Sequence, residues 1–170
     1  FNLKLNENSR IIEGGEYGHS WCYQNTNRNL IRFLLALGAP KGNKTNVELK
    51  VPNWIKTKKE FEDEFYGSFL GGELGTPTIH KQGNYLTSLE VGITGLPKFK
   101  NNRIYFLNEL ANYLKKNRVN TTSIYEGKTI NSQVYRLLIE KKIDNFLYVI
   151  DYKDSFNEID NFAITKLRRY

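Results

Sequence analysis

The residue whose type and position most directly suggest chemistry is Glu73, a single carboxylate near the end of the stretch FYGSFLGGEL (65–74). Carboxylate oxygens are the ligands that hard divalent cations such as Mg²⁺ prefer. Gly67, Gly71 and Gly72 lie in the same helix-length stretch. Each glycine inside a helix costs about 1 kcal/mol relative to alanine, so these glycines need an explanation. The simplest one is a glycine-rich helix end that turns directly into a strand.

Other residues that could do chemistry are sparse. His19 and His80 lack metal-ligand spacing with other histidines or cysteines, and we interpret both as polar surface or core residues. Cys22 is the only cysteine, which excludes a disulfide framework and a thiolate metal cluster. The chain also lacks a phosphate-binding P-loop, a dinucleotide-binding fingerprint and a Ser/His/Asp arrangement. Those classes of enzyme therefore have no support.

The composition favours a polyanionic partner. The 170 residues carry a net charge of +7 and a pI of about 9.4. Such a positive charge favours nucleic acid over a membrane surface as the partner. A basic domain without a polyanionic partner would have the same net charge. The sequence contains no apolar run long enough to span a membrane and no signal peptide. We therefore predict an intracellular location, in the cytoplasm or nucleoid, or in an organelle if the host is eukaryotic.

The first third of the chain has the pattern strand, strand, helix. Residues 1–5 and 17–24 alternate as strands do, and EGGEYG (13–18) connects them. A helix from Thr26 to Leu37 follows, capped by Thr26 or Asn25 and ended by Gly38 and Pro40. Its apolar face comprises Leu30, Ile31, Leu34, Leu35 and Leu37.

The remainder has the order helix, strand, strand, helix, strand, strand, helix, helix. The predicted elements are a helix at 58–72, a hairpin at 76–94 with its turn at Gly83–Asn84, a helix at 98–117, a hairpin at 119–139 with its turn at 126–128, and helices at 142–151 and 157–168. Residues 1–37 match the second half of this unit. We therefore predict a strand-strand-helix remnant of a first repeat plus a linker at 1–55, and a complete repeat at 56–170. The missing half would precede Phe1, and the absence of any Met agrees with this.

The stretch FYGSFLGGEL (65–74), followed directly by a hairpin, resembles the LAGLIDADG helix of archaeal-type homing endonucleases. The residues before it (34–55) and after it (72–82) are also similar to that family, and with the closing helices the likeness covers nearly the whole chain. The resemblance implies an α+β fold, the LAGLIDADG homing-endonuclease-like αββαββα repeat with a saddle-shaped antiparallel sheet. This chain would be the second half of a two-repeat protein.

The resemblance also assigns roles to the glycine-rich helix. Gly67, Ser68, Gly71 and Gly72 would form the interface with a second LAGLIDADG helix, supplied by missing upstream sequence or by another chain. Glu73 would be catalytic and would bind Mg²⁺ beside the scissile phosphates, where metal ions activate water and stabilise the leaving oxygen.

The chain departs from the family pattern in three places. Gly71 stands where an acid is frequent, and Leu74 stands where glycine is usual. The basic residue of the catalytic site would fall near Glu140, and we assign that role to Lys142. The resemblance therefore supports DNA binding more strongly than cleavage.

The hairpins of this family form a saddle in the DNA major groove, and strand alternation selects the side chains that face the DNA. These are Thr78, His80, Gln82, Ser88 and Glu90 from the first hairpin, and Thr121, Ser123, Tyr125, Gln133 and Tyr135 from the second. Phosphate contacts would come from Lys81, Lys128, Arg136, Lys141 and Lys142. The inward-facing set is Ile79, Leu89, Val91, Ile93, Ile124 and Val134. For any one of these positions, an ordinary solvated sheet face is the alternative.

We therefore predict a site-specific double-stranded DNA endonuclease that uses Mg²⁺ to hydrolyse phosphodiester bonds and serves intron or intein mobility. Two alternatives stay open. One is a non-catalytic nucleic-acid-binding descendant, such as an RNA maturase or a ribonucleoprotein component, with RNA as its partner. The other is the endonuclease domain of an intein.

Overall fold

The chain divides into two compact units, Phe1–Lys41 and Gly42–Tyr170. The computed structural model describes residues 9–14, 20–75, 89–128 and 133–140. The division after Lys41 places the polar stretch 42–55 with the second unit, whereas the sequence suggested a boundary after residue 55; that boundary stays a prediction.

The first unit contains a hairpin and a helix. Strand β1 (Ser9–Gly14) pairs antiparallel with β2 (Ser20–Asn25), and α1 (Arg28–Ala36) follows. The cap of α1 is Asn27, whose side chain accepts hydrogen bonds from the backbone N–H groups of Asn29 and Leu30 at 3.0 and 3.2 Å. The predicted caps, Thr26 and Asn25, were therefore wrong, since Asn25 instead accepts from the Asn27 N–H at 2.8 Å.

The predictions for this unit have different outcomes. The connection predicted at residues 13–18 was wrong at its start, because Glu13 and Gly14 belong to β1, a strand that the sequence did not predict. None of the residues of α1 is buried, so its predicted apolar face is not part of a core in the described structure. The strand predicted at 1–5 lies outside the described residues.

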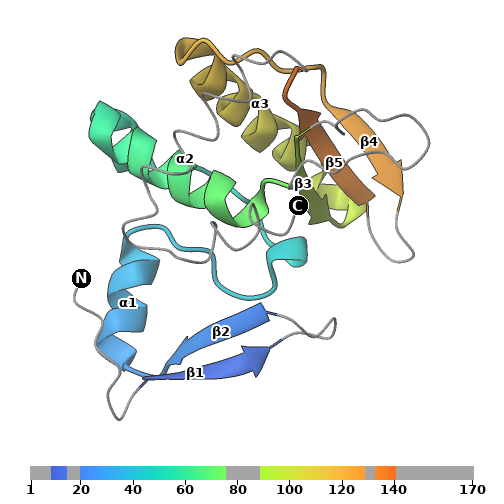
Figure 1. Cartoon of the computed structure of the whole chain (residues 1–170). Coiled ribbons are helices and arrows are strands. Elements are labelled where there is room, and N and C mark those ends of the chain that lie inside the picture. The colour runs from blue at the N-terminus through green and yellow to red at the C-terminus, as the bar shows by residue number, and fades with distance from the viewer. Residues whose placement is uncertain (1–8, 15–19, 76–88, 129–132, 141–170) are drawn as a thin grey trace. The chain divides into compact units, whose positions relative to one another are not determined.

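The second unit combines helices with a three-stranded antiparallel sheet (Figure 1). Its elements are η1 (Lys44–Asn46), η2 (Asn53–Thr57), α2 (Lys59–Glu73), β3 (Glu90–Gly95), η3 (Pro97–Phe99), α3 (Lys100–Lys116), β4 (Tyr125–Lys128) and β5 (Gln133–Leu138). The strand order is β3-β5-β4, so β5 is the central strand. The helices predicted at 58–72 and 98–117 are confirmed to within two residues.

The second hairpin differs from its prediction. Residues 126–128 were expected to form the turn, but they belong to β4 and pair with β5 through Glu126 with Tyr135 and Gly127 with Val134. The first strand of the hairpin at 76–94 and both closing helices lie outside the described residues. The αββαββα order and the saddle therefore stay predictions.

The core lies between α3 and the inner face of the sheet. Leu107 and Leu110 of α3 and Tyr135 and Leu137 of β5 are fully buried or 1% exposed. Helix α2 joins this core through Leu70 and through Tyr66, whose ring stacks on that of Tyr113 with centroids 4.3 Å apart. Of the inward-facing set, Leu89, Val91 and Ile93 are confirmed as core residues, and Ile124 packs against the core. The prediction for Val134 was wrong, because Val134 alternates with Tyr135 and lies on the face of β5 that carries Arg136, where it is nevertheless buried. Ile79 lies outside the described residues.

One charged residue, Arg103 of α3, is fully buried and is bound by oxygen atoms from three segments. Its Nε donates to the carbonyl of Thr94 at 3.1 Å, and its Nη2 donates to the carbonyls of Lys44 and Val47 at 2.7 and 2.8 Å. Its Nη1 donates to Oδ1 of Asn102 at 2.6 Å. Burial lowers the pKa of Arg103 from its ordinary value, because the charged form loses water. Arg103 thereby fixes the loop around η1 to α3 and β3.

Substitution Arg103→Met should lower the free energy of unfolding by about 3 kcal/mol, since several buried carbonyl groups lose their donor at once. Urea denaturation followed by circular dichroism measures this change. Arg118→Met is the matched control, because Arg118 is exposed at the end of α3; it should change stability by less than about 0.5 kcal/mol. Equal effects of the two substitutions would contradict the role of Arg103.

Candidate functional site

The face of the sheet opposite the core carries a compact group of polar side chains. In β3 the buried residues alternate with Glu90, Gly92 and Thr94, which are partly exposed. Gly92 lies opposite Arg136 of β5, and Arg136 lies opposite Tyr125 of β4. The sheet register therefore brings Glu90, Arg136 and Tyr125 to one face; we call them the outer-face cluster.

Each member of the outer-face cluster contacts the other two. Arg136 Nε lies 3.4 Å from Glu90 Oε1, and the Arg136 guanidinium lies over the Tyr125 ring, 5.8 Å from its centroid. The Tyr125 hydroxyl donates to Glu90 Oε2 at 2.9 Å. Since the side chain of Arg136 is 33% exposed and that of Glu90 is 42% exposed, both groups remain within reach of a partner.

Two glycines make room for the Arg136 side chain. A Cβ atom on Gly127 would lie 2.9 Å from Arg136 Nη1, and one on Gly92 would lie 3.8 Å from Arg136 Cγ. Because these neighbours lack side chains, the guanidinium can lie along the sheet surface. The sequence could not have identified Arg136 as the centre of the site, because only the strand register brings Gly92 and Gly127 beside it.

The electrostatics of the cluster act on the Tyr125 phenol. Partial burial raises the pKa of Tyr125, and the hydrogen bond and negative charge of Glu90 raise it further, whereas Arg136 lowers it. The phenol therefore stays protonated through the physiological range and remains a hydrogen-bond donor.

The structure tests only some of the predicted nucleic-acid contacts. Tyr135 was predicted to face DNA, but it is fully buried, because β5 is the central strand and Tyr135 points toward the core. Thr121 is partly buried, Ser123 is exposed, and Gln133 accepts a hydrogen bond from the Tyr135 hydroxyl at 2.6 Å. Thr78, His80, Lys81, Gln82, Ser88, Lys141 and Lys142 lie outside the described residues, as does the side chain of Lys128.

Glu73 occupies the last position of α2, close to the start of β3. The next residue, Leu74, forms an isolated bridge with Val91, and the Gly75 N–H donates to the carbonyl of Glu90 at 2.9 Å. The Glu73 side chain is 36% exposed, and its Oε1 lies 3.1 Å from Lys44 Nζ. The end of α2 thus places Glu73 beside the strand that carries Glu90.

The glycine-rich face of α2 is only partly packed. Gly67 is buried and Ser68 is exposed. A Cβ atom on Gly71 or Gly72 would meet nothing within 4 Å. The described residues therefore supply no neighbour for Gly71 and Gly72, and the predicted interface with a second helix stays a prediction.

The fit of Glu73 to a metal ion can be judged from its neighbours. Among the described residues, no group of three or more His, Cys, Asp or Glu side chains could hold a metal ion. Mg²⁺ is commonly bound by one or two carboxylates together with phosphate oxygens and water. Glu73 could therefore hold Mg²⁺, with a phosphate as the further ligand, if the carboxylate gave up its ion pair with Lys44.

Among the described helices, none combines the length and the apolar composition that a membrane-spanning helix needs.

Comparison with known proteins gives matches to enzymes of two kinds. The chain is 32% identical over 113 residues to the DNA-directed RNA polymerase subunit Rpo1N of Methanocaldococcus jannaschii, covering 65% of this chain and 8% of that protein. It is 34% identical over 164 residues to the tRNA-splicing ligase RtcB of the same organism, covering 91% of this chain and 16% of the ligase. It is 28% identical over 141 residues to the RtcB of Methanopyrus kandleri, covering 80% of this chain and 14% of that protein. No family model and no solved structure matches.

These matches contradict the identification made from the sequence. The relatives are named as RNA ligases and an RNA polymerase subunit, and their names do not include a LAGLIDADG homing endonuclease. The predicted site-specific DNA endonuclease, its role in intron or intein mobility, and the maturase, ribonucleoprotein and intein alternatives are therefore withdrawn. The similarity of FYGSFLGGEL to a family motif was insufficient for the assignment.

Substitution Glu90→Gln should lower the pKa of Tyr125, because it removes the negative charge beside the phenol, and Arg136→Gln should raise it. Ultraviolet absorbance of tyrosinate during an alkaline titration measures both shifts, with Tyr125→Phe used to assign the signal. Because the folded-state pKa is raised, the contribution of Tyr125 to stability is present below the ordinary pKa of about 10 and is lost as the pH rises through the folded-state pKa. If the Tyr125 signal in both Glu90→Gln and Arg136→Gln titrated as it does in the unmodified chain, the observed contacts would be excluded.

Proposed function

We propose that this chain is a nucleic-acid-binding module whose contact surface is the outer face of the β3-β5-β4 sheet. The observation that carries the proposal is the outer-face cluster, in which Arg136 lies along the sheet between Tyr125 and Glu90. A partly exposed arginine with a fixed guanidinium plane is suited to bind phosphate or guanine through two parallel hydrogen bonds. The net charge of +7 gives the same module a general attraction to nucleic acid.

Each member of the cluster has a distinct chemical role. Arg136 donates to phosphate oxygens or to a base edge, and Tyr125 keeps a neutral hydroxyl beside it. Glu90 accepts two contacts within the cluster and could exchange one of them for the amino group of a base. The carboxylate also reduces the positive potential at this position, which favours a specific contact over uniform phosphate binding.

The names of the relatives support a role that is common to different enzymes. Both names refer to RNA chemistry, since one protein is a subunit of a DNA-directed RNA polymerase and the other is a tRNA-splicing ligase. The aligned segment makes up 8% of the polymerase subunit and 16% of the ligase. A segment of this size that occurs in both is better suited to a shared task such as nucleic-acid contact than to either reaction, so we propose binding and not ligation.

Substitution Arg136→Gln should weaken binding to nucleic acid about tenfold and reduce the slope of log affinity against log salt by about 1. Fluorescence anisotropy with a labelled RNA hairpin and a labelled DNA duplex of matching sequence measures both quantities and shows which polymer is preferred. Lys59→Gln is the control for charge, because Lys59 pairs with Asp63 on α2. Failure of the unmodified chain to bind either polymer, or equal losses in the two variants, would refute the proposal.

We propose further that Mg²⁺ links Glu73 to a phosphate of the bound nucleic acid. Glu73 supplies one hard oxygen ligand, and its ion pair with Lys44 is a partly exposed contact of the kind that contributes only about 0–1 kcal/mol. A phosphate can therefore take Lys44 as its counterion while the metal ion takes the carboxylate. The hydrogen bond between Gly75 and Glu90 keeps this position next to the proposed contact strand.

Addition of Mg²⁺ should strengthen nucleic-acid binding by the unmodified chain about threefold to tenfold, which corresponds to one modest charge-assisted contact. Glu73→Gln should abolish this increase and leave binding without Mg²⁺ nearly unchanged. Glu64→Gln is the matched control, since Glu64 is an exposed carboxylate on the same helix. Anisotropy titrations with and without Mg²⁺ decide the point, and an equal response of both variants would exclude Glu73 as the ligand.

A further inference from the structure

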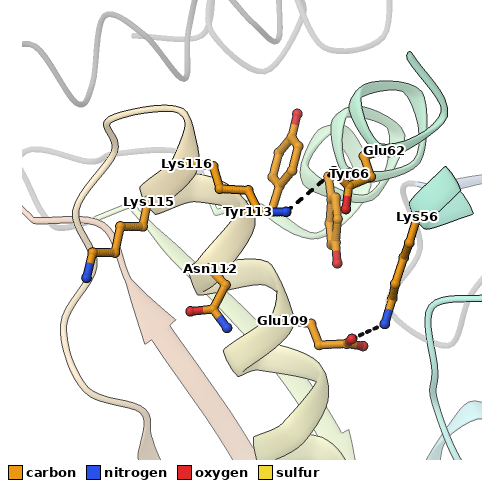
Figure 2. Close-up of a pocket in the computed structure, with 8 residues that line it drawn as sticks. All are labelled: Lys56, Glu62, Tyr66, Glu109, Asn112, Tyr113, Lys115 and Lys116. Atoms are coloured by element: carbon orange, nitrogen blue, oxygen red, sulfur yellow. Dashed lines mark hydrogen bonds and ion pairs between the residues drawn. The ribbon is translucent and has the colours of Figure 1, made fainter. Parts of the chain in front are cut away.

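The Tyr125 ring of the outer-face cluster is left open by the packing of the described residues. The rings of Tyr66 and Tyr113, by comparison, stack on each other with centroids 4.3 Å apart and are almost fully buried between α2 and α3 (Figure 2). Tyr125 is 40% exposed, and no aromatic ring among the described residues contacts it. Aromatic surfaces of this kind stack favourably on other flat rings.

Two contacts fix the orientation of the Tyr125 ring. Its hydroxyl donates to Glu90 Oε2 at 2.9 Å, and the Arg136 guanidinium lies over one face, 5.8 Å from the ring centroid. Because the hydroxyl and one face are occupied, the exposed surface of Tyr125 belongs mainly to the remainder of the ring. A ring held in this way loses little conformational entropy when a ligand stacks on it.

The strand residues around this ring carry little net charge. Among the described strand residues on the outer face, Arg136 is the one cation, and Glu90 balances its charge. The partner of Arg136 on β3 is Gly92, and Leu138, two residues beyond Arg136 on β5, is partly exposed. A surface that follows the backbone of a duplex needs a row of cations to neutralise the phosphates. This face instead offers one arginine beside an aromatic and apolar surface.

An unpaired nucleotide matches this arrangement. Its base is flat and stacks on aromatic side chains, and its base edge and phosphate can accept hydrogen bonds from an arginine. In a duplex each base is already stacked between its neighbours, so a protein ring reaches its face only after the base has been extruded. The open ring of Tyr125 therefore favours nucleotides outside a continuous duplex, such as those in single strands, loops and ends.

We propose that the outer face binds unpaired nucleotides, with a base stacked on the open side of Tyr125 and its edge or its phosphate bound by Arg136. The proposal rests on the proposed function of nucleic-acid binding and names single-stranded segments as its substrate class. Glu90 orients both side chains, and its Oε1, at 3.4 Å from Arg136 Nε, could also accept from an amino group of the base. RNA and DNA present the same unpaired chemistry, so either polymer could supply the nucleotide.

Fluorescence anisotropy with labelled RNA and DNA strands of one sequence that cannot pair with itself, each alone and annealed to its complement, tests the proposal. We expect the single strands to bind about tenfold more tightly than the duplexes, since one stacked base contributes about that factor. The tighter of the two single strands identifies the polymer. Binding of duplex as tight as that of single strand would overturn the proposal and leave the proposed function in place. Absence of binding to all four would overturn both.

Variants of Tyr125 separate stacking from charge. Tyr125→Leu should weaken single-strand binding about tenfold and duplex binding less, because it removes a stacking surface. It should not alter the slope of log affinity against log salt, which Arg136→Gln reduces. Tyr125→Phe keeps the ring and should lose less than about threefold.

The matched control is Tyr105→Leu, since Tyr105 is a 58% exposed tyrosine on α3, which covers the other face of the sheet. It should bind single strands as the unmodified chain does, and thermal unfolding checks that each variant is folded. Equal single-strand affinities of Tyr125→Leu and Tyr125→Phe, or equal losses in Tyr125→Leu and Tyr105→Leu, would overturn the assignment of Tyr125.

Discussion

The buried guanidinium of Arg103 is the interaction on which the arrangement of the second unit depends. A charge in an apolar core is tolerated only when its donors are satisfied, and here carbonyl groups of Lys44, Val47 and Thr94 satisfy it together with the side chain of Asn102. These partners come from the η1 loop, from β3 and from α3 itself. The close approach also requires a small residue, because a Cβ atom on Gly95 would lie 2.8 Å from Arg103 Nε. A single side chain thus connects a loop, a strand and a helix.

This connection extends to both proposed contact positions. The backbone of Lys44 accepts from Arg103, and the side chain of Lys44 pairs with Glu73 at the end of α2. The chain then enters β3 through hydrogen bonding between Gly75 and Glu90, and Glu90 orients Arg136 and Tyr125. The outer face of the sheet is therefore built on a rigid framework, which reduces the entropy that the side chains lose when they bind a partner.

Local signals in the sequence were sufficient to predict the helices of the second unit. They could not predict the contacts that depend on strand pairing between distant parts of the chain. The helices predicted at 58–72 and 98–117 agree with α2 and α3 to within two residues, and alternation identified Leu89, Val91 and Ile93 as inward-facing. The burial of Tyr135 was missed because parity along one strand does not reveal which face the partner strands and helix will cover. Likewise, Glu90 and Arg136 are far apart in sequence, so their contact could not be read from spacing alone.

A local sequence motif also lacks this long-range information, and for that reason the motif at 65–74 led to a wrong prediction of function. A glycine-rich helix that ends in a carboxylate describes a local conformation, whereas function depends on what surrounds the carboxylate in space. Around Glu73 the described residues provide Lys44 and the edge of a sheet, and a complete metal site would need oxygen ligands from a bound partner. The matches to a polymerase subunit and to ligases, each over a small part of the named protein, point in the same direction. Our proposal of a nucleic-acid-binding module rests on the polar cluster that the sheet presents and on the net charge of +7 of the whole chain.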